Sequence, residues 1–126
     1  MLKSVKLKDK ILEVPIIQGG MGVGISLSSL VGNVMRENCM GVLSFAHPGY
    51  SCKTFLKETS KDNFLAMKEE VDKARKISGG KGLLGVNVMV ATTEYASYVK
   101  ECVKLGVDAI ISGAGLPLNL PELTKG

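Results

Sequence analysis

A short apolar segment that ends in a cluster of glycines constrains this chain more than any other feature. Residues 14–18 have the pattern of a buried strand that ends at Gln18, and four glycines follow within six positions, at 19, 20, 22 and 24. Glycine allows positive φ and lets a ligand approach the main chain closely. Ser26 is then placed to cap a helix over residues 27–38. A strand, a glycine-rich turn and a helix N-terminus together bind polar or anionic ligands, although a tight turn without a ligand has the same pattern.

Strand and helix patterns alternate along the rest of the chain. Short apolar runs predict strands at residues 14–18, 41–45, 83–89 and 107–112, and amphipathic stretches predict helices over 27–38, 62–77 and 92–105. Residues 1–13 are expected to form a hairpin against one end of the sheet, residues 46–60 a long loop, and residues 119–126 the start of a further helix. Asn38 is expected to end the first helix in the left-handed conformation.

This alternation indicates an α/β fold with a parallel sheet covered by helices. No linker or low-complexity segment divides the chain, so residues 1–126 are expected to form a single α/β unit. Two architectures remain open at this point. One is the N-terminal half of a (β/α)8 TIM barrel, with parallel strands in chain order, and the other is a flavodoxin-like, doubly wound open sheet.

Small and polar residues recur where each predicted strand ends. They occupy residues 18–22, 44–47, 87–89 and 112–115. The carboxyl ends of parallel strands meet at one edge of a sheet, and both candidate architectures bind ligands there. We therefore expect a site for a small-molecule substrate or cofactor at this edge.

Composition argues against several other functions. The net charge is +4 and aromatic residues make up 5%, without the basic stripe and interleaved aromatics of a nucleic-acid interface. Cys39, Cys52 and Cys102 lack C-x-x-C spacing and, with His47, form no metal-binding pattern; reduced thiols fit a cytoplasmic protein. No apolar run approaches the roughly 18 residues of a membrane span, so a membrane is not an expected partner.

The glycine-rich stretches depart from two common phosphate-binding motifs. Residues 20–24 read G-x-G-x-G instead of G-x-G-x-x-G, and no acidic residue ends the strand at 41–45 to hold a ribose. Residues 78–82 follow a helix instead of a strand and lack the P-loop spacing. A dinucleotide site is therefore disfavoured, and residues 78–82 are interpreted as a helix–strand connection.

Three motifs taken together resemble the nitronate monooxygenase family, formerly called 2-nitropropane dioxygenases. They are Pro-Ile-Ile-Gln-Gly-Gly-Met at residues 15–21, Gly-Val-Asn-Val-Met at 85–89 and Val-Asp-Ala-Ile-Ile-Ser-Gly-Ala-Gly-Leu-Pro at 107–117, in the family's order and spacing. The family includes the flavin-dependent enoyl-acyl-carrier-protein reductases. The resemblance, which covers nearly the whole chain, implies a (β/α)8 barrel that binds FMN at the carboxyl ends of its strands.

The resemblance also assigns cofactor-binding residues. They are Gly20, Met21, Gly22, Asn87, Ser112, Gly113 and Ala114. The glycine turn would pack against the flavin ring, the asparagine would hydrogen-bond it, and the last three residues would close the slot. An asparagine amide offers both a donor and an acceptor, which suits the pyrimidine edge of a flavin. The alternative role of Asn87 is that of a turn former at a strand end.

By the same resemblance, the complete protein would be an FMN-dependent oxidoreductase that oxidises alkyl nitronates. The family's catalytic histidine and its phosphate-binding loops would lie beyond Gly126, so residues 1–126 alone would be incomplete. His47 does not match the family's histidine, but it is a candidate base because imidazole suits proton transfer near neutral pH. The alternatives are an enoyl-acyl-carrier-protein reductase and a non-catalytic α/β module that binds a phosphorylated small molecule.

The outer strands of such a half-barrel would have free edges. The predicted strands at 14–18 and 107–112 would each leave backbone groups unpaired, which invites pairing with another copy. A homo-oligomer through open sheet edges is therefore a further expectation.

Overall fold

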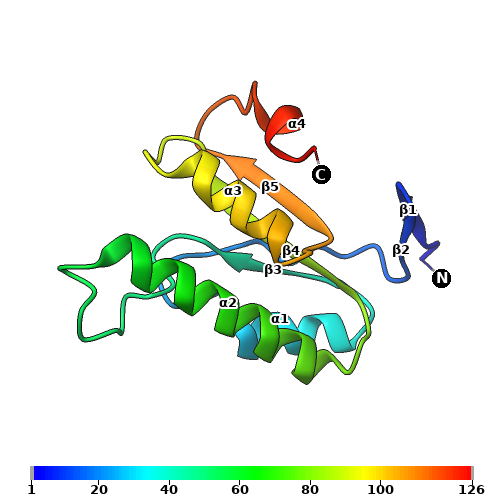
Figure 1. Cartoon of the computed structure of the whole chain (residues 1–126). Coiled ribbons are helices and arrows are strands. Elements are labelled where there is room, and N and C mark those ends of the chain that lie inside the picture. The colour runs from blue at the N-terminus through cyan, green and yellow to red at the C-terminus, as the bar shows by residue number, and fades with distance from the viewer. Residues whose placement is uncertain (1, 126) are drawn as a thin grey trace.

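The computed structural model describes residues 2–125 and has the alternating strands and helices of an α/β protein (Figure 1). The strands are β1 (Val5–Leu7), β2 (Lys10–Leu12), β3 (Met40–Ser44), β4 (Leu83–Met89) and β5 (Ala109–Gly113). The helices are α1 (Ser28–Arg36), α2 (Thr59–Ser78), α3 (Tyr95–Lys104) and α4 (Leu120–Leu123). The α/β class predicted from the sequence is confirmed.

Strands β3, β4 and β5 form a parallel sheet in chain order. Ser44 pairs with Asn87 in its register, and Asn87 pairs with Ile111. On the far side of β3, Ile17 forms an isolated parallel bridge with Met40. The strand predicted at residues 14–18 is therefore wrong in extent, although this segment does lie beside β3 as the predicted order requires.

A side chain replaces the missing part of that strand. The backbone ladder to Met40 is formed by Ile16 O and Gln18 N, at 3.0 Å each. Beyond it, the amide of Val42 donates to the side-chain Oε1 of Gln18 at 2.9 Å. The amide of Ser44 donates to the carbonyl of Ser26 at 3.1 Å, across the glycine-rich turn. The outer edge of β3 is thus satisfied without a continuous strand, as buried backbone groups require.

Helices α1, α2 and α3 pack in one layer on one face of the sheet. One apolar cluster joins the helices to the strand residues that point towards them. Its buried members include Val31, Met35, Met67, Val71, Ala74, Tyr98, Val99 and Cys102 from the helices and Leu43, Phe45, Leu84, Val86 and Val88 from the sheet. Within residues 2–125, the opposite face of the sheet carries no helix, and we call it the inner face.

The N-terminal hairpin covers one end of the inner face. Strands β1 and β2 pair antiparallel, and Figure 1 shows them at the end of the sheet where β4 and β5 begin. Leu12 is buried there with Met40, Val42 and Leu83. Lys10 Nζ lies 3.0 Å from an oxygen of Asp108, at the start of β5. The predicted hairpin and its place at one end of the sheet are both confirmed.

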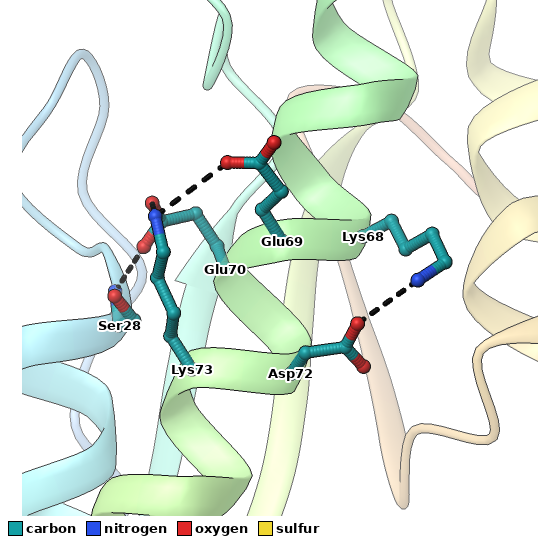
Figure 2. A network of polar contacts seen from close by, with 6 residues as sticks. All are labelled: Ser28, Lys68, Glu69, Glu70, Asp72 and Lys73. Carbon is teal, nitrogen blue, oxygen red and sulfur yellow. Dashed lines mark hydrogen bonds and ion pairs between the residues drawn. The ribbon is translucent and has the colours of Figure 1, made fainter.

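Helix α1 begins differently from the prediction. Ser26 is not its cap, and the amide of Ser28 instead donates to Glu70 Oε2 of α2 at 2.6 Å (Figure 2). A carboxylate at a helix N-terminus accepts a hydrogen bond from a free backbone amide and interacts favourably with the positive end of the helix dipole. Lys73 lies on the other side of Glu70, at 3.8 Å (Figure 2). At the end of this helix, Asn38 has φ +62°, as predicted.

Helices α2 and α3 also begin at residues other than those predicted. α2 starts at Thr59, earlier than residue 62. Asp62, in its first turn, and Asn63, the next residue, accept hydrogen bonds from Thr54 and Gly49 of the preceding loop. α3 starts at Tyr95, after a turn in which Thr92 Oγ1 donates to Met89 O at 2.9 Å. None of the helices in the described part of the chain is long and apolar enough to cross a membrane.

Candidate functional site

The glycine-rich turn lies directly on the carboxyl end of the sheet. A Cβ atom added to Gly20 would be 2.6 Å from Asn87 Cβ and 3.2 Å from Val42 Cγ1. One added to Gly22 would be 2.5 Å from Ala46 Cβ, after β3. Both positions require glycine because any side chain would displace the turn from the strand ends. The structure therefore brings Gly20 against Asn87, 67 residues further along the chain, and Gly22 against the residues that end and follow β3.

Gln18 and Ser26 hold this turn in place. The Nε2 of Gln18 donates to Ser26 Oγ at 2.9 Å and also to the carbonyl of Gly19. The fully buried Ser26 hydroxyl accepts the amide of Met21 at 2.8 Å. The Met21 amide is thus occupied, so only its half-exposed side chain remains available to a ligand. The local pattern predicts a capping role for Ser26 and does not indicate its role in the turn, because the hydrogen bond to Gln18 spans eight residues.

Asn87 occupies the middle of the inner face at its carboxyl edge. Its backbone carbonyl accepts the amide of Phe45 at 3.0 Å. No residue in the range 2–125 hydrogen-bonds its half-buried side-chain amide. The amides of Gly20 and Gly22 likewise have no acceptor within this range. Gly20 lies against Asn87, so backbone amides without an acceptor and a side-chain amide without a partner are close together here, and these are groups that a polar ligand uses.

The segment after β5 contributes less than the sequence predicts. Ser112 pairs with Val88, whose side chain faces the helices, and its hydroxyl hydrogen-bonds the hydroxyl of Tyr95 at 2.7 Å. Ser112 therefore points to the helix layer and away from Asn87. Gly113 pairs with Met89 and has open space where a Cβ would be. Ala114 follows with φ +54°, and the next residue, Gly115, lies against Val90, directly after β4.

A pocket of about 420 Å³ opens beside this edge, between the loops that follow β3 and β4. Its lining is Phe45, Ala46, His47, Thr59, Ser60, Met89, Thr92, Thr93, Glu94 and Tyr98. Met89 connects it to the inner face, since it lies two residues after Asn87 on the same strand. The Ser60 hydroxyl donates to the Glu94 carboxylate at the rim. The pocket combines an apolar floor with hydroxyl groups, a carboxylate and an imidazole.

His47 is fixed in this pocket by two neighbours. Its Nδ1 lies 3.4 Å from Nδ2 of Asn63, and its ring contacts Phe55 edge-on at a centroid distance of 5.4 Å. Asn63 is fully buried, accepts the Gly49 amide at 3.1 Å and donates to Tyr98 OH at 3.0 Å. The sequence identifies His47 as a candidate base, but the local sequence pattern does not indicate that Asn63 contacts it.

Burial raises the pKa of the Tyr98 hydroxyl above its usual value of 10.0. The charge of Glu94 acts in the same direction, whereas the hydrogen bond from Asn63 opposes it. Tyr98 also stacks on Phe45 with ring centroids 4.0 Å apart. Tyr98 therefore stays protonated near neutral pH and acts as a neutral hydrogen-bonding wall of the pocket.

No protein-family model matches the chain, and no curated protein sequence matches it. Within residues 2–125, no group of three or more His, Cys, Asp or Glu side chains is placed to hold a metal ion.

Proposed function

We propose that this chain is the N-terminal half of a (β/α)8 barrel that binds FMN, and that the complete protein oxidises alkyl nitronates, as the nitronate monooxygenases that it resembles do. The flavin would lie on the carboxyl edge of the inner face, among Gly20, Gly22, Asn87 and Gly113. The substrate would approach from the adjoining pocket.

The arrangement of the sheet supports a barrel over a flavodoxin-like sheet. A doubly wound sheet has helices on both faces and reverses its strand order at the ligand site. Here the segment around Ile17, β3, β4 and β5 follow one another in space as in sequence. Helices α1, α2 and α3 all belong to the cluster on one face. Such winding, continued, gives a barrel with its helices outside and its inner face enclosed.

The free amide of Asn87 beneath the glycine turn is the observation that carries the proposed cofactor. A flavin ring needs a flat slot with close backbone approach on one side and amide partners at its polar edge. The turn at Gly20 and Gly22 packs on the strand ends and has two backbone amides without an acceptor in residues 2–125, and Asn87 provides both a donor and an acceptor. Bound FMN would supply the redox chemistry, and these residues would bind and orient it.

The test is a titration of the purified chain with FMN, followed by flavin fluorescence and by absorbance at about 450 nm. Replacing Asn87 by Leu removes two amide hydrogen bonds, which are worth about 0.5–1.5 kcal/mol each, so Kd should rise by about 5- to 150-fold. Asn33→Leu is the matched control, because Asn33 is exposed on α1 and its side-chain amide donates to Ser29 O at 2.8 Å within the same helix. That variant should bind FMN as the unchanged chain does.

Equal FMN affinity in Asn87→Leu and Asn33→Leu would remove Asn87 from the site. A chain that does not bind FMN but binds a phosphorylated sugar would favour the non-catalytic module instead. Consumption of ethyl nitronate by the complete barrel with bound FMN would support the nitronate assignment. Its absence would favour an enoyl thioester reductase.

A further inference from the structure

The chain has one histidine, His47, and its neighbours determine which ring nitrogen faces a ligand. Asn63 is fully buried, so all of its amide hydrogen bonds are to protein atoms. The Gly49 amide, 3.1 Å away, needs an acceptor and therefore fixes Oδ1 of Asn63 on its side. The NH₂ group of Asn63 must then face Tyr98 and His47.

This orientation selects the tautomer of the imidazole. One hydrogen of the Asn63 NH₂ group is directed to Tyr98 OH at 3.0 Å, and the other faces Nδ1 of His47 at 3.4 Å. A donor opposite Nδ1 requires that nitrogen to accept, so the neutral ring carries its proton on Nε2. The Nε2–H group therefore remains available to donate to a ligand. The His47 side chain is exposed and lines the 420 Å³ pocket.

The rest of the pocket suits a small organic molecule with an oxygen head group. Phe45 and Met89 provide apolar contact for a short alkyl chain. Glu94 is the acidic side chain in the lining, and it already accepts the hydroxyl of Ser60. Its charge is thereby partly compensated, and the imidazole donor remains for a ligand oxygen.

We infer that His47 is a substrate-binding residue that donates Nε2–H to an oxygen of a short alkyl nitronate, and that Asn63 is the positioning residue that fixes its tautomer. The choice of a nitronate rests on the proposed function. The tautomer, and the Nε2–H donor that it leaves for a ligand, rest on the contacts of His47 and Asn63 and do not depend on the proposed function.

Nuclear magnetic resonance of the chain labelled with ¹⁵N-histidine tests the tautomer directly, because every imidazole signal comes from His47. We expect a protonated Nε2 and an unprotonated Nδ1 in the neutral ring. Titration with propionate, a carboxylate of the same shape as ethyl nitronate, should shift the Nε2 signal saturably. Ethyl nitronate itself should compete with propionate.

Three variants separate binding from folding. His47→Ala should weaken propionate binding by about tenfold or more, whereas His47→Gln should retain most of it, because the glutamine amide supplies a donor near the position of Nε2. Asn63→Asp should place an acceptor opposite Nδ1 and move the proton to that nitrogen. Thermal unfolding of each variant shows whether it is folded, and the two His47 variants provide the test if Asn63→Asp is not.

A neutral ring with its proton on Nδ1, or binding of propionate that is unchanged in His47→Ala, would overturn the inference. So would the absence of saturable binding of propionate and ethyl nitronate. None of these measurements involves flavin. Binding of propionate without FMN binding would therefore count against the proposed cofactor alone, and FMN binding with an unresponsive His47 would count against this inference alone.

Discussion

Two asparagines at the carboxyl side of the sheet show how one residue type serves two purposes. Asn63 is fully buried and uses its amide to join Gly49, Tyr98 and His47. Asn87 is half-buried, and its amide has no partner in the range 2–125. A satisfied buried amide specifies one conformation, whereas an unsatisfied amide at a surface edge remains available to a ligand. The first therefore organises the pocket, and the second is the better candidate for a contact to a ligand.

A buried thiol gives a prediction at the residue scale. Cys102 is fully buried in the helix layer, and burial raises the pKa of its thiol from 9.0 to about 12. Between these values the unfolded chain releases the proton while the folded chain retains it. The stability from this group is therefore complete below about pH 9 and is lost as the pH rises towards 12.

The measurement is urea unfolding at several alkaline pH values, with Cys102→Ala as the comparison. The free energy of unfolding should fall by up to about 1.4 kcal/mol per pH unit more steeply in the unchanged chain than in the variant. Other groups, including Tyr98, titrate in both proteins and cancel in the difference. Parallel curves for the two proteins would show that Cys102 does not contribute.

At the scale of elements, the close approach of α1 and α2 depends on one glycine. A Cβ added to Gly32 would lie 2.6 Å from Ile77 Cβ and 3.0 Å from the carbonyl of Ala74. Gly32→Ala gains about 1 kcal/mol of helix propensity but overpacks this contact at a cost of about 1–3 kcal/mol. We expect a lower urea midpoint than in the unchanged chain.

Ser29→Ala, at an exposed position of the same helix, is the control for the propensity gain alone. It should leave the urea midpoint unchanged or raise it. A Gly32→Ala variant at least as stable as Ser29→Ala would mean that α1 and α2 separate at little cost, and that the glycine is not required for their packing.

Most elements could be predicted because their patterns are local. The strand predicted at 83–89 is confirmed as β4, and the chain order of the strands is confirmed as well. The strand at 14–18 could not be predicted correctly, because the Gln18 side chain replaces its backbone through a bond to Val42, 24 residues away. The start of α1 depends on Glu70, which lies 42 residues from Ser28. Hydrogen bonds between residues this far apart in the sequence do not affect the local hydrophobic pattern, so that pattern does not predict them.

The residues of the candidate site likewise fall into those that the sequence predicts and those that it does not. Topology alone places Gly20, Asn87 and Gly113 at one edge, because parallel strands end together. The direction of the Ser112 hydroxyl is set by Tyr95, 17 residues away, and the orientation of His47 by Asn63. Backbone positions in a site are thus predictable from strand order, whereas side-chain partners across elements are not.

At the scale of the whole molecule, the two faces of the sheet and its outer edge at β5 are covered to different extents. The helices cover one face, and the hairpin and the glycine turn cover the two ends of the inner face. β5 pairs with β4 on one side, and no further strand in the described range pairs with its other side. All five residues of β5 are only partly buried. Leu116 and Leu118, just after it, are 79% and 85% exposed.

An uncovered strand edge beside exposed leucines favours association between copies of a chain, so we expect this chain to self-associate through β5. We expect the sedimentation coefficient of the purified chain to rise with protein concentration. Replacing Leu116 and Leu118 together by Lys adds charge beside β5 and should shift the equilibrium towards monomer. Leu56→Lys is the matched control, because Leu56 is 94% exposed but lies in the loop between β3 and α2, away from β5. A monomer at all concentrations, or an equal effect of Leu56→Lys, would show that the β5 edge does not mediate association.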